Sequence, residues 1–224
     1  MDEASPAREA AAAAAVELVE PGMTIGLGSG RAVWAVTRRL PAGTRAVVAS
    51  ERTRELALEL GVEVLALDGT FELDLALDGA DEVGSGLGLI KGGGGALLRE
   101  KIVISAARRF VVVAEASKKV ERLGETFRLP VEVVRFAWKD TRRRLSALLP
   151  ESELRRAGDG SDPYLTDEGH YILDCAIPES ADPRDLATAL AAVPGVVEHG
   201  LFLGMAEAAL LGREDGTVER LERG

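Results

Sequence analysis

A lysine, four consecutive glycines and a glutamate form one short segment with the means to do chemistry. Lys91 precedes the glycines 92–95, and Glu100 follows about one turn inside a segment expected to be helical, 96–107. Consecutive glycines cost backbone entropy on folding, so a protein places them where the chain turns sharply or approaches a ligand. The helix start beyond them would offer N–H groups and a partial positive charge to an anion. This combination predicts carbonyl chemistry on an anionic substrate.

Deprotonation of a carbon next to a carbonyl needs a base and a group that stabilises the enediolate oxygen. Glu100 could be the base, and Lys91 with the glycine N–H groups could stabilise the oxygen. The alternative is a Glu100 that pairs with Arg99 or Lys101 on an exposed helix face, and spacing by itself favours that alternative. The two histidines lie late in the chain, so a base in the glycine-rich half must be Asp or Glu.

A second glycine-rich segment, 26–30, lies between a predicted strand and a predicted helix. Backbone amides at such a helix start favour a phosphate. A dinucleotide-binding turn is one alternative, but Arg31 stands where that motif requires its third glycine. A plain strand-to-helix turn is the other alternative.

Three carboxylates, those of Asp78, Asp81 and Glu82, lie close together after another predicted strand. Such groups can hold sugar hydroxyls or move protons. The alternative is a solvated acidic turn that caps a helix. The glycine run that follows shortly afterwards favours the functional interpretation.

Alternating strands and helices predict an α/β fold with an open, mostly parallel sheet and helices on both faces. The predicted strands are 23–27, 45–50, 62–66, 73–77, 87–90 and 110–114, and the predicted helices are 5–19, 32–40, 53–60 and 96–107. Ligands of such sheets bind beyond the carboxyl ends of the strands. The segments 26–32, 78–82 and 91–101 are therefore expected to meet at one edge. Lys118 follows the strand 110–114, which favours a phosphate contact there.

A smaller α+β domain is predicted after Leu129. Its elements are a strand at 131–136, a helix at 141–149, strands at 153–156 and 171–176, a helix at 183–192 and a strand at 196–201, which is the ferredoxin-like order. A hairpin at 208–211 and 217–221 is expected to return to the first domain. The predicted domains are therefore 1–128 with 203–224, and 129–202.

Composition excludes several classes of function. The net charge of −10 and the lack of a long basic run argue against nucleic-acid binding. A single cysteine, Cys175, leaves no internal disulfide and no cysteine-rich zinc site. Cys175, His170 and His199 fall on separate predicted strands, so ordinary sheet positions are expected and no metal site. No segment is long and apolar enough to span a membrane, and acids interrupt the N-terminal alanine run, so a cytoplasmic protein is expected.

Asparagine and glutamine are absent, and arginine outnumbers lysine. Depletion of thermolabile amides is typical of thermophiles. A GC-rich genome is the alternative explanation.

Taken together, these motifs resemble those of ribose-5-phosphate isomerases of the A type. The resemblance rests on the segments 26–30, 78–82, 91–96 with 99–101, 116–118 and 129–133, and extends through 194–197 and 200–202. It implies interconversion of D-ribose 5-phosphate and D-ribulose 5-phosphate in the pentose phosphate pathway. It also implies an enediol intermediate, no metal or organic cofactor, and a homodimer or homotetramer.

The resemblance implies a role for each matching residue. Glu100 would be the base, Lys91 would stabilise the negative oxygen, Asp81 would assist ring opening, and Asp78 would hold hydroxyls. The substrate-binding residues would be Ser29, Gly30, Arg31, Ala32, Asp78, Gly79, Ala80, Asp81, Lys91, Gly92, Gly93, Gly94 and Lys118. The pair Arg31–Ala32 departs from the Ser–Thr typical of the family, so Arg31 either replaces lost hydroxyl donors or points to solvent.

Two rival functions remain at this stage. A sugar-phosphate-sensing binding module would keep the sheet and the phosphate loop, but no DNA-reading helix-turn-helix segment is visible. A coenzyme A transferase-like enzyme would use a glutamate as nucleophile, but the chain is short for that chemistry.

Overall fold

The computed structural model describes residues 5–158 and 160–223, and it divides into two compact units. Unit 1 comprises Met1–Ala80, Arg99–Lys119 and Gly204–Gly224. Unit 2 comprises Asp81–Leu98 and Val120–Leu203. The domain division expected from the sequence, 1–128 with 203–224 and 129–202, stays a prediction.

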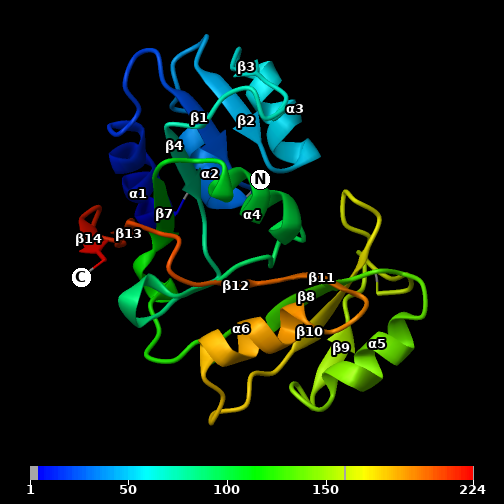
Figure 1. Ribbon diagram of the computed structural model, residues 1–224. Helices are drawn as coiled ribbons and strands as arrows, with labels where there is room; N and C mark the ends of the chain where they lie inside the picture. Colours follow the sequence, from blue (N-terminus) through cyan, green and yellow to red (C-terminus); the bar gives the residue numbers. More distant parts are fainter. Residues whose placement is uncertain (1–4, 159, 224) are drawn as a thin grey trace. The chain divides into compact units, whose positions relative to one another are not determined.

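The described part of unit 1 is built on a seven-stranded sheet (Figure 1). Its strands, in spatial order, are β14 (Val218–Glu222), β13 (Ala208–Gly212), β7 (Phe110–Glu115), β4 (Leu75–Asp78), β1 (Thr24–Leu27), β2 (Arg45–Val48) and β3 (Glu63–Val64). Every neighbouring pair is parallel except the terminal hairpin of β13 and β14. The predicted mostly parallel sheet is confirmed, and so is the return of the tail hairpin to it.

Helices cover both faces of this sheet. The helices are α1 (Pro6–Val16), α2 (Arg31–Thr37), α3 (Glu51–Glu59) and α4 (Leu97–Ser105). Ile25 and Leu27 of β1 share one core with α1, α2 and α3. Gly26, between them, faces the other side, where an added Cβ would lie 2.6 Å from Val103 of α4. Because side chains alternate along β1, α4 lies on the opposite face of the sheet. Because Gly26 has no side chain, α4 can approach the strand closely there.

Unit 2 contains a four-stranded antiparallel sheet. Its strands, in spatial order, are β11 (Val196–His199), β8 (Leu129–Val133), β10 (Tyr171–Cys175) and β9 (Ser152–Leu154), with helices α5 (Trp138–Leu145) and α6 (Pro183–Ala191). The chain order β8-α5-β9-β10-α6-β11 with this pairing confirms the predicted ferredoxin-like arrangement.

The two faces of this smaller sheet differ in chemistry. Leu129, Val131 and Val133 of β8 share an apolar core with residues of α5 and α6. Successive side chains of a strand point to opposite faces. Glu132 of β8 and Asp174 of β10 therefore face away from the two helices, and they form part of a polar face.

A third, three-stranded antiparallel sheet corrects one sequence prediction. Its strands are β12 (Leu201–Phe202), β6 (Leu89–Ile90) and β5 (Glu82–Val83), in that order. The predicted strand 87–90 was assigned to the parallel sheet, and this is wrong. The glycine-rich turn after Val83 folds the chain back, so that β6 pairs with its sequence neighbour β5. The argument from parallel strand ends therefore does not apply to Lys91.

Several other boundaries differ from those predicted, and two of the differences concern strands of the sheet of unit 1. The strand expected at 62–66 is only the edge strand β3, and the strand expected at 45–50 ends at Val48. Ser50 is not extended sheet but the N-cap of α3, because its hydroxyl accepts a hydrogen bond from the Thr53 N–H.

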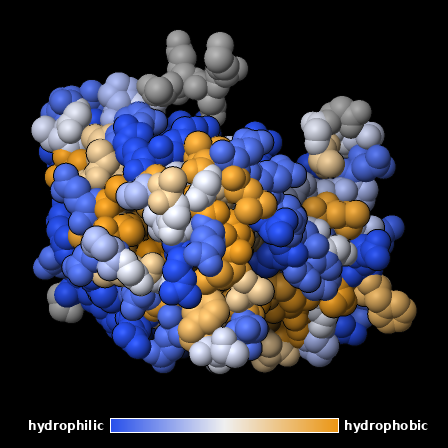
Figure 2. Space-filling view, turned by 90° about the horizontal axis from the view of Figure 1, so that it is seen from above, coloured by the Kyte–Doolittle hydropathy of each residue, from blue (hydrophilic) through white to orange (hydrophobic). Residues whose placement is uncertain are grey.

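Among the residues that the structure describes, no helix combines the length and apolar character needed to span a bilayer. Figure 2 shows hydrophilic residues mainly around the edge of one face and hydrophobic residues gathered across its middle.

Candidate functional site

The carboxyl ends of β1 and β4 lie side by side in the sheet of unit 1. From β1 the chain continues through α2 to β2 on one side, whereas β4 pairs with β1 on the other side. This is a topological switch point, the place where open parallel sheets bind ligands. The loop that follows β1 and the acidic residue that ends β4 meet here, as the sequence predicted.

Gly28 and Asp78 approach each other more closely than any other residue type at position 28 would allow. The Gly28 N–H donates to the Leu77 carbonyl at 3.0 Å, and an added Cβ would lie 1.8 Å from Asp78 Cγ. Asp78 is fully buried, and its Oδ1 accepts hydrogen bonds from the N–H groups of Ser29 at 3.2 Å and Gly79 at 2.7 Å. The turn thus fixes a buried carboxylate below the glycine loop.

We expect the Gly28→Ala variant to lose stability, because the new methyl group would overlap the Asp78 side chain. Overpacking typically costs about 1–3 kcal/mol, and each kcal/mol lowers the melting temperature of a chain of this size by about 2–4 °C. Thermal unfolding followed by circular dichroism measures the effect. Gly79→Ala is the matched control, since its Cβ would meet only Ala32 Cβ at 3.6 Å and the Val113 carbonyl at 3.8 Å. Equal melting temperatures for the two variants would contradict this account.

Glu100 lies in the first turn of α4 with only 3% of its surface exposed. The Ser29 hydroxyl donates to Glu100 Oε1 at 3.0 Å. The alternative of an exposed Glu100 on the outer face of its helix is therefore wrong. Arg99, the adjacent residue, forms an ion pair with Glu51 at 2.9 Å. Unit 1 thus brings together Ser29, Asp78 and Glu100, which are far apart in the sequence.

The other predicted binding residues of unit 1 also follow strands of its sheet. Gly30, at φ +86°, is the N-cap of α2, and Arg31 begins that helix with an exposed side chain. Ala32 and Ala80 are half-buried. Lys118 is half-buried and ends the 3-10 helix η2 (Ala116–Lys118), directly beyond β7. Because β7 pairs with β4 in parallel, its carboxyl end lies on the same edge as that of β4.

Lys91, in unit 2, is a buried cation with 2% of its surface exposed. Its ammonium nitrogen lies 5.4 Å from the centre of the Phe202 ring, a favourable distance for a cation–π contact. Its backbone N–H donates to the Gly200 carbonyl at 2.9 Å. A Cβ at position 200 would lie 2.3 Å from the Lys91 carbonyl oxygen, so a glycine there allows the two chain segments to touch.

The glycine segment 92–95 turns sharply, as its composition predicts. Gly92 and Gly95 have φ angles of +103° and +85°, which favour glycine. The half-buried Asp81 accepts a hydrogen bond from the Gly93 N–H at 2.8 Å. A Cβ at position 93 would lie 2.6 Å from Asp81 Oδ1. The structure of unit 2 therefore brings Asp81 to the glycine segment.

Glu82, the third member of the acidic cluster, has a different environment. It is fully buried and accepts hydrogen bonds from the Gly124 N–H, from the Thr126 N–H and hydroxyl, and from the Phe127 N–H. These donors hold the chain at 124–127 in place. Glu82 is therefore a structural residue, and the interpretation of the cluster as a functional unit applies to Asp78 and Asp81 alone.

Two residues that were not predicted from the sequence contact the glycine segment within unit 2, and a third binds one of them. Arg155 and Tyr164 donate hydrogen bonds to its carbonyl groups, and Asp174 binds Arg155. One signal was available, because a charged residue alternates with Leu173 and Cys175 in a predicted strand. The partner of that charge could not be read from the sequence.

Of the three residues considered as metal ligands, Cys175 and His199 lie in strands as expected, whereas His170 directly precedes β10. Burial, with a smaller contribution from Asp174, raises the pKa of the Cys175 thiol to about 12. His170 Nδ1 lies 2.9 Å from Glu132 Oε1. Burial raises the pKa of Glu132, and its hydrogen bonds with His170 and Thr166 oppose that shift. His199 lies on β11. Within the described ranges, no group of three His, Cys, Asp or Glu residues could hold a metal ion.

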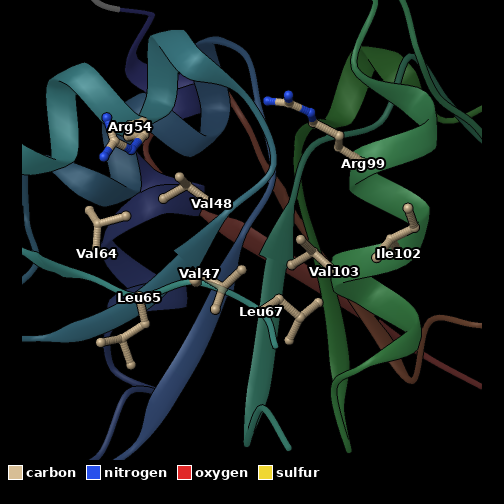
Figure 3. A pocket seen from close by; sticks show the side chains of 10 residues that line it. Val47, Val48, Arg54, Val64, Leu65, Leu67, Arg99, Ile102 and Val103 are labelled. Carbon is tan, nitrogen blue, oxygen red and sulfur yellow. The ribbon is translucent and has the colours of Figure 1, made fainter. Parts of the chain in front are cut away.

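A cavity of about 240 Å³ in unit 1 lies on the sheet face that α4 covers (Figure 3). Its walls are apolar side chains of β2, α4 and the segment 64–67, and Arg54 and Arg99 lie at its rim. None of the residues predicted for catalysis or substrate binding lines it. The candidate site is therefore not this cavity but the groups described above.

Comparison with known proteins shows which proteins this chain is similar to. The family model for Ribose 5-phosphate isomerase A (phosphoriboisomerase A) matches residues 45–216. A ribose-5-phosphate isomerase A from Synechococcus sp. (strain JA-3-3Ab) is 50% identical over the full length of both chains. The solved ribose 5-phosphate isomerase A from Methanocaldococcus jannaschii is 35% identical, with a TM-score of 0.88 over 96% of this chain and 97% of that one. A D-ribose-5-phosphate isomerase solved in complex with phospho-erythronic acid is 34% identical, with the same TM-score and coverage.

Proposed function

The chain belongs to the ribose 5-phosphate isomerase A family and has that family's isomerase role, and from this premise we propose how its residues carry out the reaction. A relative that is 50% identical over the full length of both chains is named a ribose-5-phosphate isomerase A. Neither rival function, the sugar-phosphate-sensing module or the coenzyme A transferase-like enzyme, is therefore favoured. The reaction interconverts an aldose, D-ribose 5-phosphate, and a ketose, D-ribulose 5-phosphate. It moves one proton between two neighbouring carbons.

Glu100 is the proposed base. It removes the proton from C2 of the open-chain aldose and returns it to C1, while the hydroxyl proton moves from O2 to O1. The carboxylate is thereby regenerated, and no proton is gained or lost overall. The observation that carries this assignment is the buried carboxylate of Glu100, held by the Ser29 hydroxyl on the loop that follows β1. A carboxylate held in one orientation can take a proton directly from a substrate placed within its reach.

Lys91 is the proposed stabiliser of the enediolate oxygen, together with the N–H groups of Gly92 and Gly94, because the Gly93 N–H donates to Asp81. Its burial supports this role, because a cation has a stronger effect where water is excluded. The backbone of Lys91 is fixed by its hydrogen bond to Gly200, which reduces the reorganisation needed during the reaction.

The remaining assignments follow the family pattern. Asp81 assists ring opening, and Asp78 with Gly79 and Ala80 contacts the sugar hydroxyls. The phosphate binds to Lys118 and to the loop Ser29, Gly30, Arg31 and Ala32. Support for the loop comes from its place between the carboxyl end of β1 and the start of α2. The exposed Arg31 can then provide the charged donor in place of the family's hydroxyl groups.

An assay of ribulose 5-phosphate formation tests the proposed function. The purified chain should convert ribose 5-phosphate with a chelator present and without any added cofactor, because the proposed mechanism uses only its own side chains and amides. Phospho-erythronic acid, a four-carbon acid phosphate, should inhibit competitively. The proposal would be refuted if no product formed under these conditions and none formed when divalent metal replaced the chelator.

We also propose that the enzyme is a cytoplasmic homodimer or homotetramer from a thermophile. The lack of asparagine and glutamine supports the last point. Analytical ultracentrifugation and a melting curve of the purified chain address the oligomeric state and the thermostability; a monomer, or a melting temperature of about 45–65 °C, would contradict them.

A further inference from the structure

Three consecutive carbonyl groups of the glycine segment accept hydrogen bonds from side chains of unit 2. Arg155 Nη1 donates to the carbonyls of Gly92 at 2.8 Å and Gly93 at 3.1 Å. The Tyr164 hydroxyl donates to the Gly94 carbonyl at 3.1 Å. Side chains of unit 2 thus hold a run of glycines, the residue type with the greatest backbone freedom, along one side.

Arg155 is itself anchored. Its Nε donates to Asp174 Oδ2 at 2.9 Å, and its Nη2 donates to Asp174 Oδ1. Only 13% of the Arg155 side chain and 23% of the Asp174 side chain are exposed. The strand β10 presents Asp174 on the polar face of its sheet, and Arg155 directly follows β9, the neighbouring strand. Because the ion pair is neutral overall, it supplies direction to the glycine carbonyls rather than net positive charge.

Because peptides are planar, hydrogen bonds that orient the carbonyl groups also orient the N–H groups of the following residues. In a planar trans peptide the C=O of one residue and the N–H of the next point in opposite directions. Fixing the carbonyls of residues 92–94 therefore fixes the directions of the N–H groups of residues 93–95. The Gly93 N–H, directed in this way, donates to Asp81 Oδ2 at 2.8 Å.

We propose that Arg155, anchored by Asp174 and assisted by Tyr164, is a positioning residue for the isomerisation. It holds the glycine segment so that the amide groups and Asp81 keep the directions that the reacting sugar needs. The inference rests on the role proposed above for the glycine segment.

A fixed segment matters because glycines have more conformational freedom to lose than any other residue. Without the guanidinium group, the segment would sample other turns, and the amide groups would be misaligned for part of the time. Misplacement of binding groups by about 1 Å can cost about 100-fold in rate. A lysine cannot replace the arginine, because one ammonium group cannot pair with the carboxylate at two points and reach two carbonyls as well.

The decisive experiment compares Arg155→Ala, Arg155→Lys, Asp174→Asn and Tyr164→Phe by steady-state kinetics and thermal melting. We expect kcat to fall about 10- to 100-fold in the two Arg155 variants and less in the other two, with KM changed by less than about 3-fold. About 20 mM guanidinium ion, far below denaturing concentrations, should restore part of the kcat of Arg155→Ala. A purely structural role would not give this rescue.

Arg8 and Glu115 provide a matched control in unit 1, since their ion pair has almost the same exposure, 13% and 26%. Arg8→Ala should lose similar stability with kcat unchanged. The inference would be overturned if folded Arg155→Ala had a normal kcat, or a kcat no lower than that of Arg8→Ala. If Arg155→Ala does not fold, Arg155→Lys and Asp174→Asn decide in the same way. Failure of the native chain to form ribulose 5-phosphate would instead refute the proposed function, so the two failures are distinguishable.

Discussion

Replacing Glu100 with glutamine is expected to lower kcat about 10²- to 10⁴-fold, the usual contribution of a general base. The amide keeps the shape of the side chain, and its oxygen can still accept the Ser29 hydroxyl that now binds Glu100 Oε1. It cannot take a proton from carbon. Because an uncharged amide is less costly to bury than a carboxylate, the melting temperature should not fall.

The measurement is initial-rate kinetics of ribulose 5-phosphate formation beside a melting curve. Glu51→Gln is a suitable control, because this glutamate lies on the exposed start of α3 and pairs with Arg99, the neighbour of Glu100. It should retain near-normal turnover. Near-normal turnover of Glu100→Gln itself would remove the base from the proposed mechanism.

Replacing Lys91 with methionine is expected to lower kcat about 10²- to 10³-fold with a smaller effect on KM. The reason is that a cation next to the enediolate oxygen acts mainly on the transition state, where the negative charge develops. Methionine keeps an unbranched apolar stem against Phe202, so the packing of this buried position should survive.

The kinetic constants of Lys119→Met provide the comparison. Lys119 is half exposed and pairs with Glu219 at 2.7 Å, so its loss should leave both kcat and KM near those of the native chain. A change confined to KM in Lys91→Met would make Lys91 a ground-state binding residue. Unchanged kinetics would show that its charge takes no part in the reaction.

The residue types of the candidate site could be predicted because their order along the chain is unusual. Four glycines between a lysine and a glutamate can be read directly, and so can a glycine loop between a strand and a helix. Alternation of strands and helices likewise predicted the parallel sheet, since each element buries a face of fixed periodicity. The ferredoxin-like order of the elements from β8 to β11 could be predicted from the sequence for the same reason.

Short elements were harder to assign. The strand β6 has two residues, too few for any periodic pattern, and its pairing with β5 and β12 depends on a distant segment. The sheet predicted for β6 from the sequence is therefore the wrong one. Glu82 shows the same limit. The N–H groups that donate hydrogen bonds to it, at 124–127, lie about forty residues away in the chain.

By itself the sequence determined which groups are available: a glutamate, a lysine, two aspartates and two glycine loops. Tertiary structure alone decided that Glu100 is buried against Ser29, that Asp78 leaves room at position 28 only for glycine, and that Arg155 holds the glycine segment. The physical reason is that local patterns fix the conformation of neighbouring residues. Burial and hydrogen bonding between residues far apart arise only when the strands have taken their places in the sheets.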